Sequence, residues 1–273
     1  MLYILILMGS NKMDETEMKR KKVISILKMV LILLVLLLLC TCFYEGSSYR
    51  SQVLKHIEKI GDNPTQNQID EMFISGQYIY GDDPESAKLY FEKVAEYEPR
   101  AAYYLSEYYY EKKDMDNYLK WAKHAGERGV GDAQFNLGVY YKEKNKLKEA
   151  EKWYIKAAEQ GHVEAQYNLG VLYEKNNRLE EAENWYIKSA EQGFVNAQYN
   201  LGVLYEKNNR LEEAKNWYLK AAEQSFVDAQ YNLGVLYEKK DRLEEAKNWY
   251  SKAASQGDKE AAENLKILEK MGD

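Results

Sequence analysis

AQYNLGVLYEKNNRLEEA, residues 165–182, is repeated almost unchanged further along the chain. It returns letter for letter at residues 197–214, and it returns again from Ala229 with KKD in place of KNN. The copies are spaced by 32 residues, a period that is typical of helical solenoids. A catalytic site is built once, so repetition of this kind indicates architecture or a repeated contact surface.

Two residue types mark the same period over a longer stretch. Four glycines and all five tryptophans lie in register: Gly138, Gly170, Gly202 and Gly234, and Trp121, Trp153, Trp185, Trp217 and Trp249. Weaker copies extend upstream, with Tyr109 in register and Tyr78 in register after a small phase slip. The pattern therefore predicts an all-α protein with six helix pairs over residues 66–273.

Each copy contains two amphipathic stripes. Apolar residues follow Ala165 at i+4, i+7 and i+8, which is the spacing of one buried helix face. A second stripe runs from Leu179 to Ala190 and predicts a second helix. One copy is thus expected to be an antiparallel helix pair joined by a short turn.

The residues between the stripes suggest how the helices begin and end. Asn177 and Asp241 are each followed three residues later by Glu, which predicts them as N-caps of the second helices. Gly161 and Gly193 are suited to end the second helices, because glycine readily adopts the left-handed conformation.

Gly170 falls inside a predicted helix, where glycine costs about 1 kcal/mol relative to alanine. Close packing of the second helix against a residue without Cβ would offset this cost. In the last copy Lys266 stands where the glycine is due, and no second helix follows it. Residues 259–271 are therefore predicted to form a polar capping helix.

The N-terminal region contains an apolar segment over residues 23–44. The stretch from Val23 to Phe43 is 21 residues long, enough to cross about 30 Å of hydrocarbon as a helix, and Lys28 lies near one end of it. A basic cluster at residues 19–22 precedes it, which predicts that residues 1–22 lie in the cytoplasm and the repeats on the outer side. Met18 is a conventional start for such a segment, so residues 1–17 are set aside as an upstream start.

Three interpretations of the apolar segment compete. It is expected to be a retained transmembrane anchor in the cytoplasmic (inner) membrane, with the repeats facing the periplasm or the extracellular side. It could also be a lipoprotein signal with lipid on Cys40 or Cys42, although neither cysteine follows a small residue. A cleaved signal peptide is the third alternative, and the absence of an A-x-A-like site weakens it. Residues 45–65 are predicted to be a linker with a short helix.

The charge distribution excludes some partners. Residues from Glu45 onward carry 32 basic and 41 acidic side chains. This region should repel polyphosphate, so no nucleic-acid binding is expected. The motifs also lack a nucleophile with its base, a glycine-rich phosphate loop and a repeated metal-ligand set. We therefore expect no enzyme activity, no cofactor, no metal and no small-molecule substrate.

The repeat motif resembles a known family. A-Q-x-N-L-G-x-x-Y followed by E-A-x-x-W-Y-x-K-A-A-E-Q-G is similar to the Sel1-like branch of the tetratricopeptide repeat superfamily, over residues 66–273. The resemblance implies a right-handed α/α superhelical solenoid that serves as a scaffold for protein complexes. The turn at residues 175–178 is shorter than the family usually has, and the chain lacks the cysteine pairs of many members.

On such a superhelix the first helices line the concave face. The residues expected to point into this groove are Phe135, Asn136, Val139, Tyr167, Asn168, Val171, Glu174, Tyr199, Asn200, Val203, Tyr231, Asn232 and Val235. The asparagine amides could bind the backbone of a peptide, with the tyrosines as contact area. Alternatively, each asparagine bonds a neighbouring helix as part of the repeat framework, which we favour because the repeats are so similar.

These expectations favour one function and leave a second open. The first is a membrane-tethered, non-enzymatic scaffold that binds protein or peptide partners in its groove. The second is a structural or host-facing protein of the cell envelope, in which the array acts as a spacer or self-associates.

Overall fold

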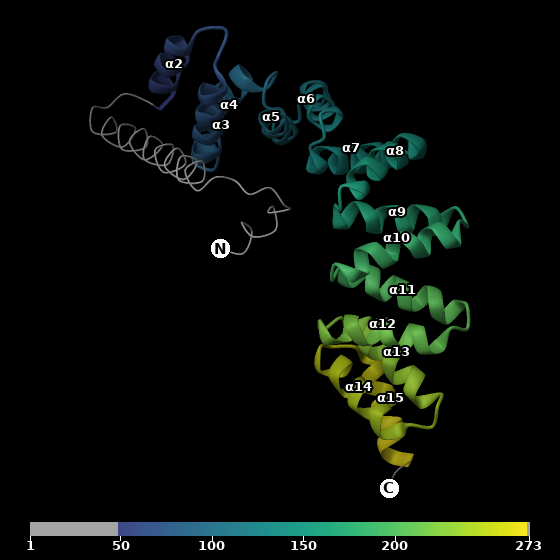
Figure 1. Ribbon diagram of the computed structural model, residues 1–273. Helices are drawn as coiled ribbons and strands as arrows, with labels where there is room; N and C mark the ends of the chain where they lie inside the picture. Colours follow the sequence, from purple (N-terminus) through teal and green to yellow (C-terminus); the bar gives the residue numbers. More distant parts are fainter. Residues whose placement is uncertain (1–48, 272–273) are drawn as a thin grey trace, which may run out of the picture. The chain divides into compact units, whose positions relative to one another are not determined.

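The computed structural model describes residues 49–271, and all regular secondary structure in this range is α-helical (Figure 1). The helices are α2 (Tyr49–Ile60), α3 (Gln66–Tyr80), α4 (Pro84–Val94), α5 (Pro99–Glu111), α6 (Met115–Glu127), α7 (Gly131–Glu143), α8 (Leu147–Glu159), α9 (Val163–Lys175), α10 (Leu179–Glu191), α11 (Val195–Lys207), α12 (Leu211–Glu223), α13 (Val227–Glu238), α14 (Leu243–Ser255) and α15 (Lys259–Met271). In chain order, α3 to α14 make the six pairs that the periodicity predicts.

The chain divides into two compact units, with the boundary after Tyr108 in α5. In the first unit α4 packs against both α3 and α2. A Cβ added to Gly76 of α3 would lie 2.6 Å from Cε1 of Phe91 in α4, so this pair already shows close packing on a glycine. The Phe91 ring also stacks on Tyr104 of α5, with centroids 4.9 Å apart.

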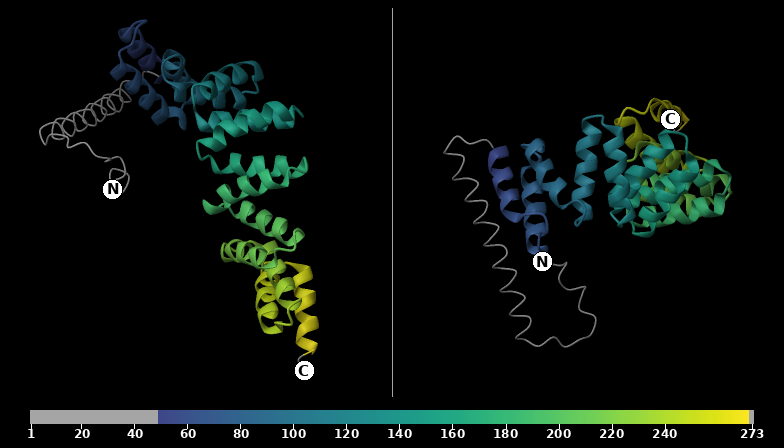
Figure 2. Two further views of the ribbon diagram at one scale, coloured as in Figure 1. Left: turned by 45° about the vertical axis from the view of Figure 1, so that its right-hand side comes forward. Right: turned by 90° about the horizontal axis from the view of Figure 1, so that it is seen from above.

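The second unit is a regular stack of helix pairs. Within each pair the two helices are joined by a short turn and run in opposite directions, and the second helix packs on the first helix of the next pair (Figures 1 and 2). The last helix, α15, packs on α14 and spans residues 259–271, as predicted for the capping helix. The array is a helical solenoid of the kind that the repeat predicts.

The repeat glycines lie where two helices meet, which confirms the close-packing prediction. A Cβ added to Gly202 of α11 would lie 2.5 Å from Cδ1 of Tyr218 in α12, and the same tyrosine of each other pair faces its glycine. Tyr218 is completely buried, so its ring fills the space that the missing side chain leaves. The first-helix glycine is therefore required by the second-helix tyrosine.

The turn inside each pair differs from the sequence prediction. Asn177 and Asp241 are not N-caps: both have left-handed backbones, with φ of 58° and 57°. Asn177 donates its N–H to the carbonyl of Glu174 (3.0 Å), and Arg178 donates to Tyr173 (2.8 Å). This is the Schellman arrangement that ends a helix, in which asparagine and aspartate tolerate the left-handed position. The second helix then begins after Arg178, whose side chain makes no capping bond.

The turn between pairs follows the prediction at the glycines. Gly161 and Gly193 both have φ of 90° and end α8 and α10. Ser225 takes the same place after α12 with φ of 64°, a conformation that costs a residue with a Cβ about 1–2 kcal/mol. This turn is therefore the strained member of the series.

A buried amide ladder, which the sequence analysis did not predict, links successive pairs. Gln198 of α11 is 5% exposed, and its Nε2 donates to the carbonyl of Ala190 at the end of α10 (3.1 Å). Its Oε1 accepts a hydrogen bond from Nε2 of Gln224 (2.8 Å). Gln134, Gln166 and Gln230 make the equivalent contacts in the other copies. The Ala-Gln start of the motif thus caps the preceding helix.

The predicted N-terminal features lie outside the described residues. These are the basic segment 1–22, the apolar segment 23–44 and the two cysteines within it. Within residues 49–271, no helix combines the length and apolar character needed to cross a membrane.

Candidate functional site

The predicted groove residues lie on the first helices α7, α9, α11 and α13, and all of them are half-buried. The valines at this face pack partly into the core. The aromatic and asparagine side chains are half-buried as well, and Asn200 of α11 reaches Tyr167 of the preceding first helix. We call this surface the first-helix face.

The asparagines of this face belong to a polar network. Tyr186 of α10 donates its hydroxyl hydrogen to Glu174 of α9 (2.9 Å). Nδ2 of Asn200, on α11, donates to the hydroxyl oxygens of Tyr186 (3.4 Å) and Tyr167 (3.5 Å). The network therefore ties both helices of one pair to the first helix of the next, as the framework alternative for the asparagines requires.

The same network recurs in the next two copies. Tyr218 donates to Glu206 (3.0 Å) and Tyr250 donates to Glu238 (2.7 Å). Burial and the carboxylate partner raise the pKa of each of these tyrosines, so they remain protonated donors. Lys207 adds an ion pair to Glu174, with Nζ 3.2 Å from Oε1.

One copy breaks the pattern. Tyr154 of α8 is 1% exposed, and its hydroxyl has no hydrogen-bond partner within residues 49–271. One substitution removes the acceptor: Lys142 stands at the position of Glu174, which accepts the tyrosine hydroxyl in the next copy. Lys142 instead donates to Oδ1 of Asn168 at 3.5 Å.

An aromatic ring from the loop before each of the helices α9, α11 and α13 packs on the first-helix face. Phe194 packs on Tyr167 with ring centroids 5.2 Å apart, and Phe226 packs on Tyr199 at 5.0 Å. His162 fills the same place one copy earlier and stacks on Phe135 at 4.6 Å, with the ring planes inclined by 19°. These loop rings cover the sides of the aromatic residues that face the next repeat.

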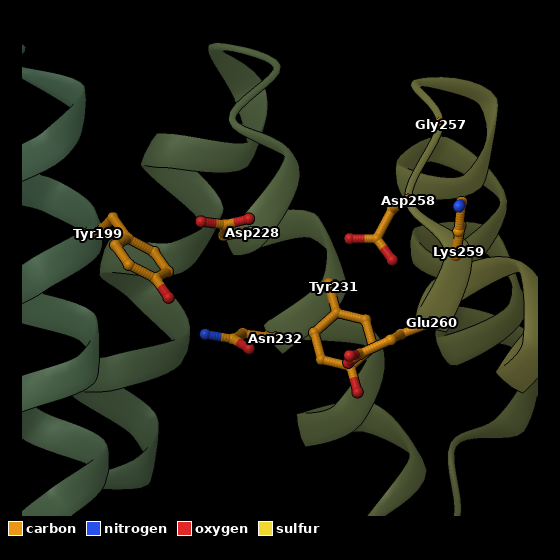
Figure 3. A pocket seen from close by; sticks show the side chains of 8 residues that line it. All are labelled: Tyr199, Asp228, Tyr231, Asn232, Gly257, Asp258, Lys259 and Glu260. Atoms are coloured by element: carbon orange, nitrogen blue, oxygen red, sulfur yellow. The ribbon is translucent and has the colours of Figure 1, made fainter.

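The last copy has no such ring, because Asp258 occupies the loop position. A hollow of about 550 Å³ is present there, lined by Tyr199, Asp228, Tyr231, Asn232, Gly257, Asp258, Lys259 and Glu260 (Figure 3). The figure shows the carboxylates of Asp228 and Asp258 turned toward the space between α13 and the loop, with the Tyr231 ring below. Three of the predicted groove residues are thus brought together with acidic residues that the prediction omitted.

The electrostatics of the hollow are acidic. Three carboxylates face one ammonium group, and Asp258 also caps α15 by accepting the N–H of Ala261 (2.8 Å). Burial and the nearby Glu260 carboxylate raise the pKa of Tyr231, so its hydroxyl remains neutral. Nowhere in residues 49–271 does a group of three or more His, Cys, Asp or Glu side chains have the arrangement of a metal site.

The tryptophans lie on the second helices, away from this hollow. Each carries a lysine ammonium over its ring, for example Lys220 at 3.8 Å from the ring centre of Trp217. The rings are also partly buried against the core, which indicates a packing role.

Comparisons with known proteins agree with this architecture. Two tetratricopeptide repeat models match the chain, one at residues 135–193 and the other at residues 195–226 and 227–256. A Sel1 repeat protein from Oxalobacter formigenes is 28% identical, with a TM-score of 0.57 over 71% of this chain and 88% of that one. The pilF protein of Pseudomonas aeruginosa is 16% identical, with a TM-score of 0.55 over 73% of this chain and 97% of that one. Comparison with curated proteins gave no match.

Proposed function

Because the chain is a Sel1-like repeat protein of the tetratricopeptide superfamily, we propose that it is a non-enzymatic scaffold that binds protein partners along the first-helix face. The observation that carries the proposal is the surface itself. Half-buried aromatic and apolar side chains recur on four successive first helices and lead to an open hollow at the last of them. Tyrosines of this kind supply large contact areas in protein interfaces.

The polar network changes which residues are assigned to the partner. Asn200 already donates to two tyrosine hydroxyls, and Glu174 already accepts from Tyr186 and pairs with Lys207. The asparagines therefore serve chiefly to hold the tyrosines in place. Contact with a partner is assigned to the exposed parts of the aromatic rings and to the hollow.

The proposal includes a membrane tether at residues 23–44, with the repeats on the outer side of the cytoplasmic membrane. Its support is the apolar length of this segment and the basic cluster before it. Mass spectrometry of the mature N-terminus tests the tether. An intact N-terminus supports the anchor, whereas a chain that begins at a lipidated Cys40 or Cys42 supports an envelope lipoprotein instead.

Site-specific photo-crosslinking in cells tests the binding face. A photoreactive amino acid at Val203, on the first-helix face, should capture partners, and the same group at the exposed Asn216 of α12 should not. A captured partner should also bind the purified chain. An excess of this purified partner should reduce the crosslinking of other proteins at Val203. Capture of the chain itself, or equal capture at both positions, would favour the spacer or self-associating alternative.

A further inference from the structure

The hollow at the last repeat has a filled counterpart inside the same chain. Three repeats earlier, the His162 ring stacks on Phe135 at 4.6 Å and lies between two carboxylates. Its Nε2 is 3.4 Å from Asp132, and its Nδ1 is 3.3 Å from Glu164. Nδ1 accepts the N–H of Ala165 in one tautomer of the ring and donates to Glu164 in the other. The chain thus holds a flat group, able to carry positive charge, between an aromatic ring and two acids.

The last repeat has an aromatic residue and two acidic residues at the positions that surround the His162 ring, but it has no ring between them. Tyr231 stands at the position of Phe135, Asp228 at that of Asp132, and Glu260 at that of Glu164. At the ring-bearing position Asp258 replaces His162 and adds a third carboxylate, and beside it Lys259 replaces Val163 and adds one ammonium group. The hollow lies beside this loop position, with Asp258, Asp228, Tyr231 and Glu260 among the residues that line it (Figure 3).

Two properties of the site identify its occupant. In the three preceding copies the place is filled by a flat ring, from His162, Phe194 or Phe226, so the shape suits a planar group. The three carboxylates select positive charge. A guanidinium is planar, remains charged, stacks on aromatic rings and pairs with carboxylates, whereas an ammonium lacks the flat shape.

We propose that the hollow binds an arginine side chain of a partner protein, stacked on Tyr231 and paired with Asp228 and Glu260. The inference rests on the proposed scaffold function and specifies its partner: a segment bound along the first-helix face presents an arginine to the last repeat. The hollow is then the recognition subsite of an otherwise repetitive surface. Asp258 serves both as the third acid and as the cap of α15.

Saturation-transfer NMR on the full chain tests the subsite directly. The probe is N-acetyl-arginine amide, and N-acetyl-citrulline amide is its uncharged isostere. The arginine probe should receive saturation at the methylene beside the guanidinium, and the citrulline probe should not. Asp228→Asn should weaken binding by about two- to fivefold, the range expected for one partly exposed ion pair.

Two substitutions fill the hollow with groups that the chain already uses at this position. Asp258→Phe copies Phe226, and Asp258→His copies His162, which retains a capping group for the helix. Both should abolish saturation of the arginine probe while circular dichroism stays unchanged. If Asp258→Phe disturbs folding, Asp258→His alone decides. Asp241→Asn makes the charge change of Asp228→Asn in a turn outside the hollow and should leave binding unchanged.

Equal saturation of the two probes would overturn the proposal. So would binding that survives both substitutions of Asp258, or binding that Asp241→Asn weakens as much as Asp228→Asn. The scaffold function is tested separately by crosslinking. If partners are captured at Val203 but the arginine and citrulline probes receive equal saturation, the subsite proposal is wrong and the scaffold proposal stands. Arginine binding without any captured partner would support the subsite and remove the scaffold.

Discussion

Gly202→Leu tests the packing on which every repeat depends. A Cβ at this position would lie 2.5 Å from Cδ1, 2.6 Å from Cε1 and 3.1 Å from Cγ of Tyr218. Ordinary contact between carbon atoms needs about 3.5 Å or more, so the ring or the helix must move by about 1 Å. Tyr218 has little freedom to move, because it is fully buried and its hydroxyl is bonded to Glu206 at 3.0 Å.

The expected magnitude follows from two opposing effects. Overpacking a core typically costs about 1–3 kcal/mol and occasionally more, and leucine adds further atoms beyond the Cβ that already collides. Leucine is favoured over glycine in a helix by somewhat less than about 1 kcal/mol. Because the added Cβ would already lie 2.5 Å from a fully buried ring, the upper end of the overpacking range applies, and the net loss in the free energy of unfolding should be about 2 kcal/mol, or roughly 4–8 °C in Tm for a unit of this size.

Thermal unfolding followed by circular dichroism measures the effect. Gly131→Leu is the matched control, because a Cβ at Gly131 would meet nothing within 4 Å. It should leave Tm unchanged or raise it slightly. In the Gly202→Leu background, Tyr218→Ala should cost less than it does alone, since it vacates the contested space. An unchanged Tm for Gly202→Leu, or an equal fall for Gly131→Leu, would refute the packing argument.

Three further predictions concern single positions in the repeats. Ser225→Gly should raise the free energy of unfolding by about 1 kcal/mol, because glycine adopts the left-handed turn without strain, and Gly193→Ser should lower it in the same denaturation assay. Lys142→Glu should stabilise by about 1–3 kcal/mol in urea denaturation, because it gives the buried Tyr154 hydroxyl an acceptor. Two lysine partners lower the pKa of Glu212 to about 2, so its stabilising contribution is present above the ordinary carboxyl range near 4.5 and is lost as the pH falls toward about 2. Glu212→Gln should therefore weaken the acid dependence of Tm between these pH values.

The helix pairs could be predicted from sequence because their signals are local. The 32-residue period, the apolar stripes and the in-helix glycine fix the number of pairs and the close approach of Gly202 to its partner helix. The capping helix followed from Lys266 in the glycine position. These features depend on spacing along the chain, which the sequence displays.

The turn prediction was wrong because two structural positions favour the same residues. Asparagine and aspartate are common both as N-caps and in the left-handed position after a helix. Glu180 lies three residues after Asn177 and therefore suggested that Asn177 is an N-cap. In the structure the ion pair of this turn joins Arg178 to the next residue, Glu181, and the Arg178 guanidinium lies over the Tyr173 ring. Whether Asn177 caps the second helix or ends the first depends on the backbone conformation that a three-residue turn requires. The residue types in the turn do not reveal that conformation.

The site was only partly predictable, because it depends on contacts between repeats. The bond from Asn200 to Tyr186 joins helices whose relative placement the sequence does not state. The buried role of Gln198 was missed because a polar residue on an apolar stripe gives no sign of its acceptor. The hollow did have a sequence signal: Asp258 breaks a loop series of His162, Phe194 and Phe226.

The hydrogen bonds and ion pairs between adjacent repeats also have a consequence for how the number of repeats can change. The bonds that join two repeats connect residues of adjacent copies, as from Gln198 to Ala190 and from Arg210 to Glu183. Deleting residues 195–226 would place Gln230 against Ala190 and Arg242 against Glu183, so the new junction would reproduce an old one. Recombination between near-identical copies can therefore shorten or extend the array by whole repeats without requiring any new interface.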